Sequence, residues 1–330
     1  MNMNSREDRI PLCFTVNRKH YESGALRRMI QAGIRFYRIN LGRTDAAVCR
    51  SMCRELRQTA AAYRCPVQIE VDLPGAKARI AGVQPYAAKT GSEERLCFAE
   101  AGVLRSDAEW LRTALHEGDV IRIGRKGVQA EVTALMPDAA HLRFTAPGII
   151  KPRDMIAAAN RSMELPQMTQ QDQHLLEALA GADFDLLAVS FTQCGEQIRN
   201  VRARMRGLGY SAQIRIAAKI EEAAGIANYA EIGRAADGIM VGRGDMSELL
   251  GMDHANAFIT ELQTNWTRNG RLLILASYYF QDVVAETGGV DPALLQHAAA
   301  GADYFVTDES SYYDWKKIYD AYNECFGSRP

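Results

Sequence analysis

A lysine and a glutamate two residues apart are the side chains of this sequence with the clearest chemical potential. Lys219 and Glu221 stand in "IRIAAKIEEAAGI", whose apolar run indicates a β-strand. Because strand side chains alternate between two faces, Lys219 and Glu221 share one face near the strand's end. An ammonium in an apolar run is costly without partners, which favours a functional site.

A second acidic residue follows the next predicted strand. In "ADGIMVGRGDMSE" we expect Gly242 and Gly244 to allow a tight turn that directs Asp245 toward the same site. Glu221 and Asp245 would then offer oxygen ligands to Mg²⁺ (or Mn²⁺), which takes one or two carboxylates and completes its shell with water and substrate oxygens. Taken separately, such acidic residues are commonly helix caps or surface groups, so the ligand role is a hypothesis.

The elements that position these residues alternate between short apolar runs and segments of helical period. This alternation is typical of βα units around a parallel sheet. Strands are predicted at residues 12–16, 34–39, 67–72, 186–191, 214–220, 238–241, 272–277 and 304–307. Helices are predicted between them, for example at residues 46–63 and 225–235. The pattern predicts an α/β fold, a (β/α)8 TIM barrel, whose strand ends carry the functional residues.

The interval between the third and fourth predicted strands has a different texture. Short alternating runs with turn residues, at 119–124, 128–135 and 141–146, indicate strands. An interval of roughly 80 residues is far longer than a loop of ~2–6 residues. We therefore divide the chain into a barrel catalytic domain of residues 1–80 and 160–330 and a small β-rich lid domain of residues 81–159, inserted after the third strand.

Charge and composition exclude several function classes. Lys plus Arg number 39 and Asp plus Glu number 40, and this balance argues against a nucleic-acid partner. No apolar run approaches the ~20 residues that cross a bilayer, and the N-terminus lacks a signal-peptide pattern, so we expect no membrane association. The 7 cysteines include no CxxC, which favours a cytoplasmic protein. A homo-oligomer formed through outer barrel helices is left open.

Five segments of the sequence resemble the pyruvate kinase family. They are "RIN" at 38–40, "VDLPGAKARI" at 71–80, "SF" at 190–191, "AAKIEEAAGIANYAEI" at 217–232 and "ADGIMVGRGDMSELLG" at 236–251, of which the last two are the most specific. The resemblance covers the barrel from about residue 11 to 310 and extends more weakly to the inserted domain. It implies a barrel enzyme that acts on phosphoenolpyruvate or a 2-oxo acid such as pyruvate.

The resemblance also implies roles for individual residues. Lys219 corresponds to an active-site lysine near the transferred phosphoryl group, Arg38 to a phosphoryl-binding arginine, and Ser277 to a threonine at the site of enolate protonation. Glu221 and Asp245 correspond to the two metal-binding carboxylates. The substrate side would comprise the Gly244 backbone, Arg243 and Ser190. The nucleotide and charge-balancing side would comprise Arg79, Lys77, Asn40 and Asp72.

Departures from the family pattern lie mainly on the nucleotide and potassium side. Leu41, Gly42 and Arg43 stand where the family usually has Phe-Ser-His-Gly after Asn40, so a potassium-ligating serine is absent. Lys77 stands where potassium-dependent members carry a glutamate, which implies that potassium is not required. The segment "VNRKHYESG" replaces Gly-Pro-Ser-Ser after the first strand, and this change argues against ADP binding. The sequence leaves no room for the family's C-terminal regulatory domain, so we expect no control by a sugar phosphate.

Three functions remain open from the sequence. The first is phosphoryl transfer from phosphoenolpyruvate to a nucleotide, with ADP or ATP as the second substrate. The second is a metal-dependent lyase, aldolase or decarboxylase of a 2-oxo acid that has lost the nucleotide site. The third is a non-catalytic binding protein, which is disfavoured because an unused buried lysine with two carboxylates would cost stability.

Overall fold

The structure, a computed structural model, describes residues 10–82, 84–98, 102–124, 127–276, 279, 295, 300–312 and 314–326. Ser277, predicted as a catalytic residue, lies outside the described residues. The described residues form two compact units. One comprises those of Met1–Gly75, Gln170–Glu221 and Gly225–Pro330, and the other those of Ala76–Thr169 with Glu222–Ala224.

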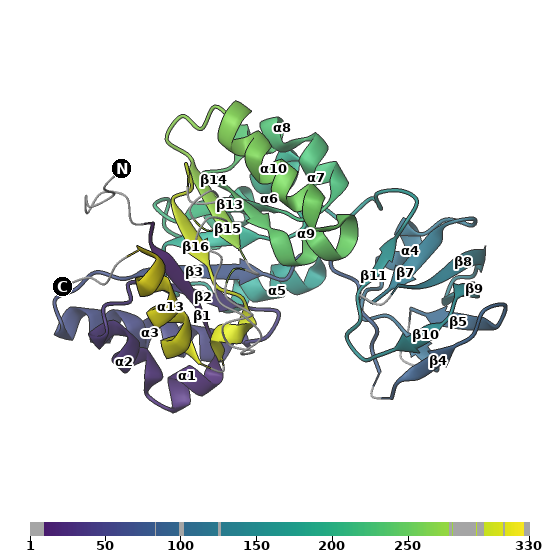
Figure 1. Cartoon of the computed structure of the whole chain (residues 1–330), viewed down its shortest axis with the longest axis horizontal. Helices are drawn as coiled ribbons and strands as arrows, with labels where there is room; N and C mark the ends of the chain where they lie inside the picture. The colour runs from purple at the N-terminus through teal and green to yellow at the C-terminus, as the bar shows by residue number, and fades with distance from the viewer. Residues whose placement is uncertain are drawn as a thin grey trace. The chain divides into compact units, whose positions relative to one another are not determined.

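The first unit is built around a closed barrel of eight parallel strands (Figure 1). In barrel order the strands are β1 (Leu12–Val16), β16 (Tyr304–Val306), β15 (Leu272–Ala276), β14 (Gly238–Gly242), β13 (Arg215–Ile220), β12 (Leu186–Val189), β3 (Gln68–Leu73) and β2 (Phe36–Asn40). Every strand predicted for the barrel is present, within three residues at each end. The predicted fold class is confirmed.

The barrel strands form because their sequences suit burial on both faces. β13 reads RIAAKI and β14 reads GIMVG, and all but the first residue of the two strands is buried. Such near-continuous apolar runs are typical of parallel sheets that are covered on both sides. Below the strand ends, the interior is filled by side chains that include Met240, Ile274 and Val306. This packed floor leaves the carboxyl ends of the strands as the place for polar groups.

Helices surround the barrel. They are α1 (Arg18–Glu22), α2 (Ala25–Gln31), α3 (Ala46–Ala62), α5 (Gln170–Ala178), α6 (Gly195–Gly207), α7 (Ala223–Ala227), α8 (Tyr229–Ala235), α9 (Arg243–Leu250), α10 (Met252–Asn265), the 3₁₀ turn η1 (Glu309–Tyr312) and α13 (Trp315–Phe326). The helix predicted over residues 225–235 is wrong in its outline: α7 and α8 are separate, with Asn228 between them outside helical geometry at φ −104° and ψ 9°.

The tight turn predicted at Gly242 and Gly244 is also wrong. Residues 243–250 form helix α9, which begins directly after β14. Gly242 has φ −82°, a value open to other residue types, so its role is not conformational. Asp245 is therefore held on the first turn of a helix instead of on a glycine loop.

The second unit is β-rich. Its six-stranded sheet has the order β11 (Ile156–Ala158), β7 (Val120–Ile123), β8 (Val128–Leu135), β9 (Ala139–Ala146), β5 (Glu93–Cys97) and β6 (Leu104–Arg105), and β10 (Gly148–Ile150) pairs with β4 (Tyr86–Ala88). A short helix, α4 (Leu111–Ala114), precedes β7. The main segment of the unit, Ala76–Thr169, begins five residues before and ends ten residues after the 81–159 that we predicted.

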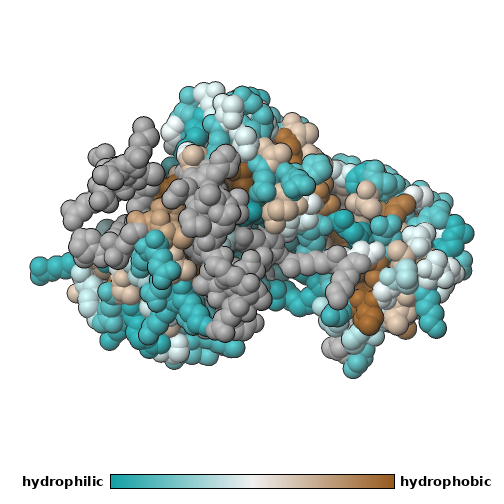
Figure 2. Space-filling model, in the orientation of Figure 1, coloured by the Kyte–Doolittle hydropathy of each residue, from teal (hydrophilic) through white to brown (hydrophobic). Residues whose placement is uncertain are grey.

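The visible surface of the described residues is mostly hydrophilic, with separate hydrophobic patches (Figure 2). Within the described part of the chain, no helix combines the length and the hydropathy needed to cross a membrane.

Candidate functional site

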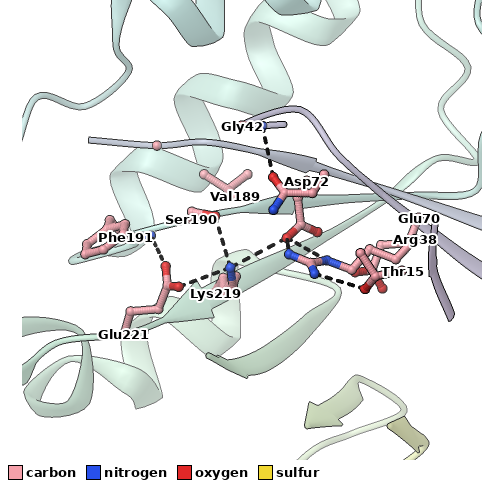
Figure 3. Close-up of polar contacts among 12 residues, drawn as sticks. Thr15, Arg38, Gly42, Glu70, Asp72, Val189, Ser190, Phe191, Lys219 and Glu221 are labelled. Carbon is pink, nitrogen blue, oxygen red and sulfur yellow. Dashed lines mark hydrogen bonds and ion pairs between the residues drawn. The ribbon is translucent and has the colours of Figure 1, made fainter. Parts of the chain in front are cut away.

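Lys219 lies at the centre of a buried polar cluster at the end of β13 (Figure 3). Its Nζ atom is 3.0 Å from Glu221 Oε1 and 3.5 Å from Asp72 Oδ2. It is also 3.5 Å from the hydroxyl of Ser190, which follows β12. Its side chain is only 10% exposed. Strands β3, β12 and β13 thus bring three predicted site residues to the lysine.

The charge state of Lys219 follows from these neighbours. Burial disfavours the ammonium, but the carboxylates of Glu221, Asp72 and Asp245 outweigh burial and raise the pKa of Lys219 above its ordinary value. The side chain is therefore a fixed cation at neutral pH. The negative charge of Asp245, on the neighbouring helix α9, contributes to this shift after those of Glu221 and Asp72.

Glu221 is fully buried and held from two sides. Its Oε2 accepts a hydrogen bond of 3.0 Å from the backbone N–H of Phe191, and its Oε1 faces Lys219. Phe191 has φ 55°, an uncommon conformation for a bulky residue that persists only where surrounding structure enforces it. On the other side Gly242 leaves no room for a side chain beside Glu221.

Asp245 and Gly244 occupy the first turn of α9. The first backbone N–H groups of a helix have no acceptor within the helix, and the helix dipole adds partial positive charge there. The Gly244 carbonyl accepts a 2.9 Å hydrogen bond from the hydroxyl of Ser247, which fixes the turn. The first turn of α9 can thus offer an anionic group both N–H donors and a neighbouring carboxylate for a cation.

Arg38 extends the cluster from β2. Its Nε donates to Asp72 Oδ2 at 2.9 Å, and its Nη2 donates to the same oxygen. Its Nη1 donates to the hydroxyl of Thr15 on β1 at 3.1 Å. Although burial opposes ionisation, Arg38 and then Lys219 lower the pKa of Asp72. Asp72 is therefore a carboxylate that links the two cations.

Two members of this network, Glu70 and Thr15, were not among the predicted site residues. Glu70 Oε1 lies 3.7 Å from Arg38 Nε. The signal for Glu70 is present in the sequence, because it stands two positions before Asp72 on the same strand and so on the same face. Thr15 gives no comparable signal, since a threonine is ordinary in a strand.

Asn40 and Arg43 contact Glu309, which follows the eighth barrel strand. Arg43 Nε lies 3.0 Å from Glu309 Oε1, and Asn40 Nδ2 donates to the same oxygen at 3.5 Å. Asn40 Oδ1 accepts a 2.9 Å hydrogen bond from the Gly42 N–H. Asn40 is thus tied to Glu309 of η1 and to its own loop.

Arg243 is buried at the start of α9 and contacts α10 and Tyr279. Its Nη2 is 3.3 Å from Asn256 Oδ1, and its guanidinium lies 4.0 Å from the centre of the Tyr279 ring. Its predicted substrate-binding role stays a prediction. Burial lowers its pKa, against a smaller opposite effect of Tyr279.

Lys77 and Arg79 belong to the second unit. Arg79 donates from Nη1 to the Arg153 carbonyl at 2.7 Å, and its backbone N–H donates to Asp107 Oδ1 at 2.7 Å. Their nucleotide and charge-balancing roles stay predictions.

The described residues contain no group of three or more His, Cys, Asp or Glu side chains arranged to hold a metal ion. Two carboxylates, Glu221 and Asp245, nevertheless act on one lysine. Hard oxygen donors in this number suit Mg²⁺, which leaves the remaining positions to water and substrate. The donor set therefore fits a magnesium ion that is completed by its substrate.

Comparisons with known proteins identify the family of the chain. Residues 9–285 match the family described as "Pyruvate kinase, barrel domain". A pyruvate kinase of Aeropyrum pernix is 28% identical over 254 residues, which are 77% of this chain and 54% of that protein. For a pyruvate kinase of Chlamydia pneumoniae the identity is 28% over 228 residues, 67% of this chain and 47% of the relative. The chain thus spans about half the length of these curated relatives.

Proposed function

Because this chain belongs to the pyruvate kinase family, we propose that it is a pyruvate kinase-like phosphotransferase that moves the phosphoryl group of phosphoenolpyruvate to ADP and leaves the enolate of pyruvate. The observation that supports this most strongly is the buried Lys219 ammonium, held by Glu221 at 3.0 Å and by Asp72 at 3.5 Å. A pre-oriented cation in a buried site suits phosphoryl transfer, because the main requirement of that reaction is to stabilise the negative charge of the phosphoryl group.

Lys219 and Arg38 would neutralise the phosphoryl group. Phosphoryl transfer depends on positioning and on charge stabilisation, since the protein contributes little covalent chemistry. Both cations are anchored on Asp72 Oδ2, so they are placed before substrate arrives and need no reorganisation during the reaction.

Glu221 and Asp245 would hold the divalent metal. When bound, Mg²⁺ would stabilise negative charge on the enolate oxygen as a Lewis acid. Glu221 is fixed for this role by the Phe191 N–H and by Gly242, so its carboxylate cannot swing away. The first turn of α9, with the Gly244 backbone, would receive the substrate carboxylate through N–H groups.

The test is a direct assay of both products. Purified protein with Mg²⁺, phosphoenolpyruvate and ADP should form pyruvate and ATP in equal amounts, and EDTA should stop the reaction. We expect this activity without added potassium. Pyruvate formation that needs no nucleotide, or no turnover of phosphoenolpyruvate at all, would overturn the proposed phosphoryl transfer.

A further inference from the structure

Two acidic side chains of β3 share one buried face of the barrel. Glu70 and Asp72 stand two positions apart on the strand and are 3% and 1% exposed. Both lie beside the same guanidinium: Arg38 Nε is 2.9 Å from Asp72 Oδ2 and 3.7 Å from Glu70 Oε1. Two carboxylates this close in a dry interior would repel each other strongly.

The hydrogen bonds satisfy the two groups unequally. Asp72 Oδ2 accepts hydrogen bonds from Arg38 and lies 3.5 Å from Lys219 Nζ in an ion pair, and Glu70 Oε2 accepts a hydrogen bond of 2.8 Å from the hydroxyl of Tyr304. If both groups are ionised, the remaining oxygens, Glu70 Oε1 and Asp72 Oδ1, are buried without a hydrogen-bond donor among the described residues. Buried polar atoms without a partner are rare, since each costs ~1–3 kcal/mol. A single proton would remove the repulsion and supply the missing donor.

We propose that Glu70 is a protonated carboxylic acid in the folded protein and shares its proton with Asp72, as a positioning residue that holds Asp72 and Arg38 in place. Both side chains lie on one face of β3 and beside the same Arg38 Nε atom, so a protonated Glu70 is placed to hydrogen-bond to Asp72. The Glu70 O–H then donates and the Asp72 carboxylate accepts. When the pH rises, the O–H bond of Glu70 breaks and its proton is released to solvent.

The surrounding groups favour this proton. Burial, and then the negative charge of Asp72, raise the pKa of Glu70 to about 8, while Arg38 and the Tyr304 hydroxyl oppose the shift. Burial also raises the pKa values of Cys13 on β1 and Tyr304 on β16, so both stay neutral.

Two more cations act on the groups that surround Glu70. Lys219 faces Asp72, and Arg215 acts on Tyr304. With Glu70 neutral, the Asp72 carboxylate pairs with Arg38 and Lys219, and the Glu221 carboxylate pairs with Lys219.

Infrared difference spectroscopy of the full chain tests the proposal without substrate. At pH 6.5 the wild-type spectrum should contain the C=O stretch of a protonated carboxylic acid, and this band should disappear in Glu70→Gln. Asp119→Asn is the matched control, because Asp119 is also buried beside an arginine, Arg161, but its pKa is lowered. That variant should leave the band unchanged.

The pH dependence of this band distinguishes a protonated Glu70 from a Glu70 that has only a structural role. The band should fade in wild-type protein as the pH rises through about 8. The neutral Glu70→Gln should fold as wild type does and should lose this titration. A wild-type spectrum without a titrating band overturns the proposal even if the variant does not fold, and so does a band that survives in Glu70→Gln. Because no turnover is measured, failure here is separate from failure of the proposed reaction.

Discussion

Gly242 lies directly against Glu221, at the ends of β14 and β13. A Cβ atom at position 242 would be 2.5 Å from Glu221 Cγ and 2.8 Å from Glu221 Oε1. Those distances are shorter than side-chain atoms tolerate, so one of the two residues would have to move. Position 242 therefore needs a glycine because a larger residue would clash with Glu221. Its backbone, with φ −82°, would accept other residue types.

Gly242→Ala should therefore displace Glu221. We expect a loss of stability of about 1–3 kcal/mol, since overpacking a tight interior has that cost, together with a fall in turnover of phosphoenolpyruvate. Urea unfolding and the product assay measure the two effects. Gly207→Ala, where a Cβ meets nothing within 4 Å, is the control and should be neutral in both. Equal stability and equal turnover of the two variants would contradict the inferred contact between position 242 and Glu221.

Lys219→Met should leave Glu221 and Asp72 without their shared cation. We expect kcat to fall by about 100-fold or more, as when a preorganised electrostatic group is deleted, and the free energy of unfolding to fall by roughly 3–5 kcal/mol. Lys316→Met, at an exposed position of α13, is the matched control. A Lys219→Met protein that keeps wild-type kcat would show that the ammonium does not act on the phosphoryl group.

His20 should make the protein sensitive to acid. It is buried on α1, and burial lowers its pKa to about 4, although a backbone hydrogen bond at Ser311 opposes the shift. The folded state thus binds fewer protons than the unfolded state between pH 4 and the ordinary value of 6.5. Stability should fall as the pH drops below 6.5, by up to about 3 kcal/mol near pH 4.

Thermal unfolding at a series of pH values measures this dependence. In His20→Gln the slope between pH 6.5 and 4 should be smaller than in wild type. Parallel pH profiles for the two proteins would mean that His20 does not titrate differently on folding.

The barrel could be predicted from the sequence because its strands are continuous apolar runs of strand length. The strand over residues 12–16, LCFTV, was predicted with the bounds that the structure shows. The period of two also placed Lys219 and Glu221 on one face, and their 3.0 Å contact agrees with that placement.

Other features have no signal of this kind. The polar helix α1 has no apolar period and begins through a capping box between Asn17 and His20. The break between α7 and α8 at Asn228 coincides with a hydrogen bond from its side chain to the Gln193 carbonyl, a contact that depends on the tertiary fold. The role of Gly242 likewise follows from a neighbour on another strand, which the local sequence does not reveal.

Binding of Mn²⁺, followed by electron paramagnetic resonance in the presence of oxalate as a stand-in for the enolate, tests most directly whether Lys219, Glu221 and Asp245 form one metal-dependent site. We expect wild-type protein to bind the ion and Asp245→Asn to bind it at least about tenfold more weakly, because loss of even a supporting ligand contact has that effect. Asp253→Asn, an exposed position of α10, should match wild type. Equal affinity of wild type and Asp245→Asn would contradict the account.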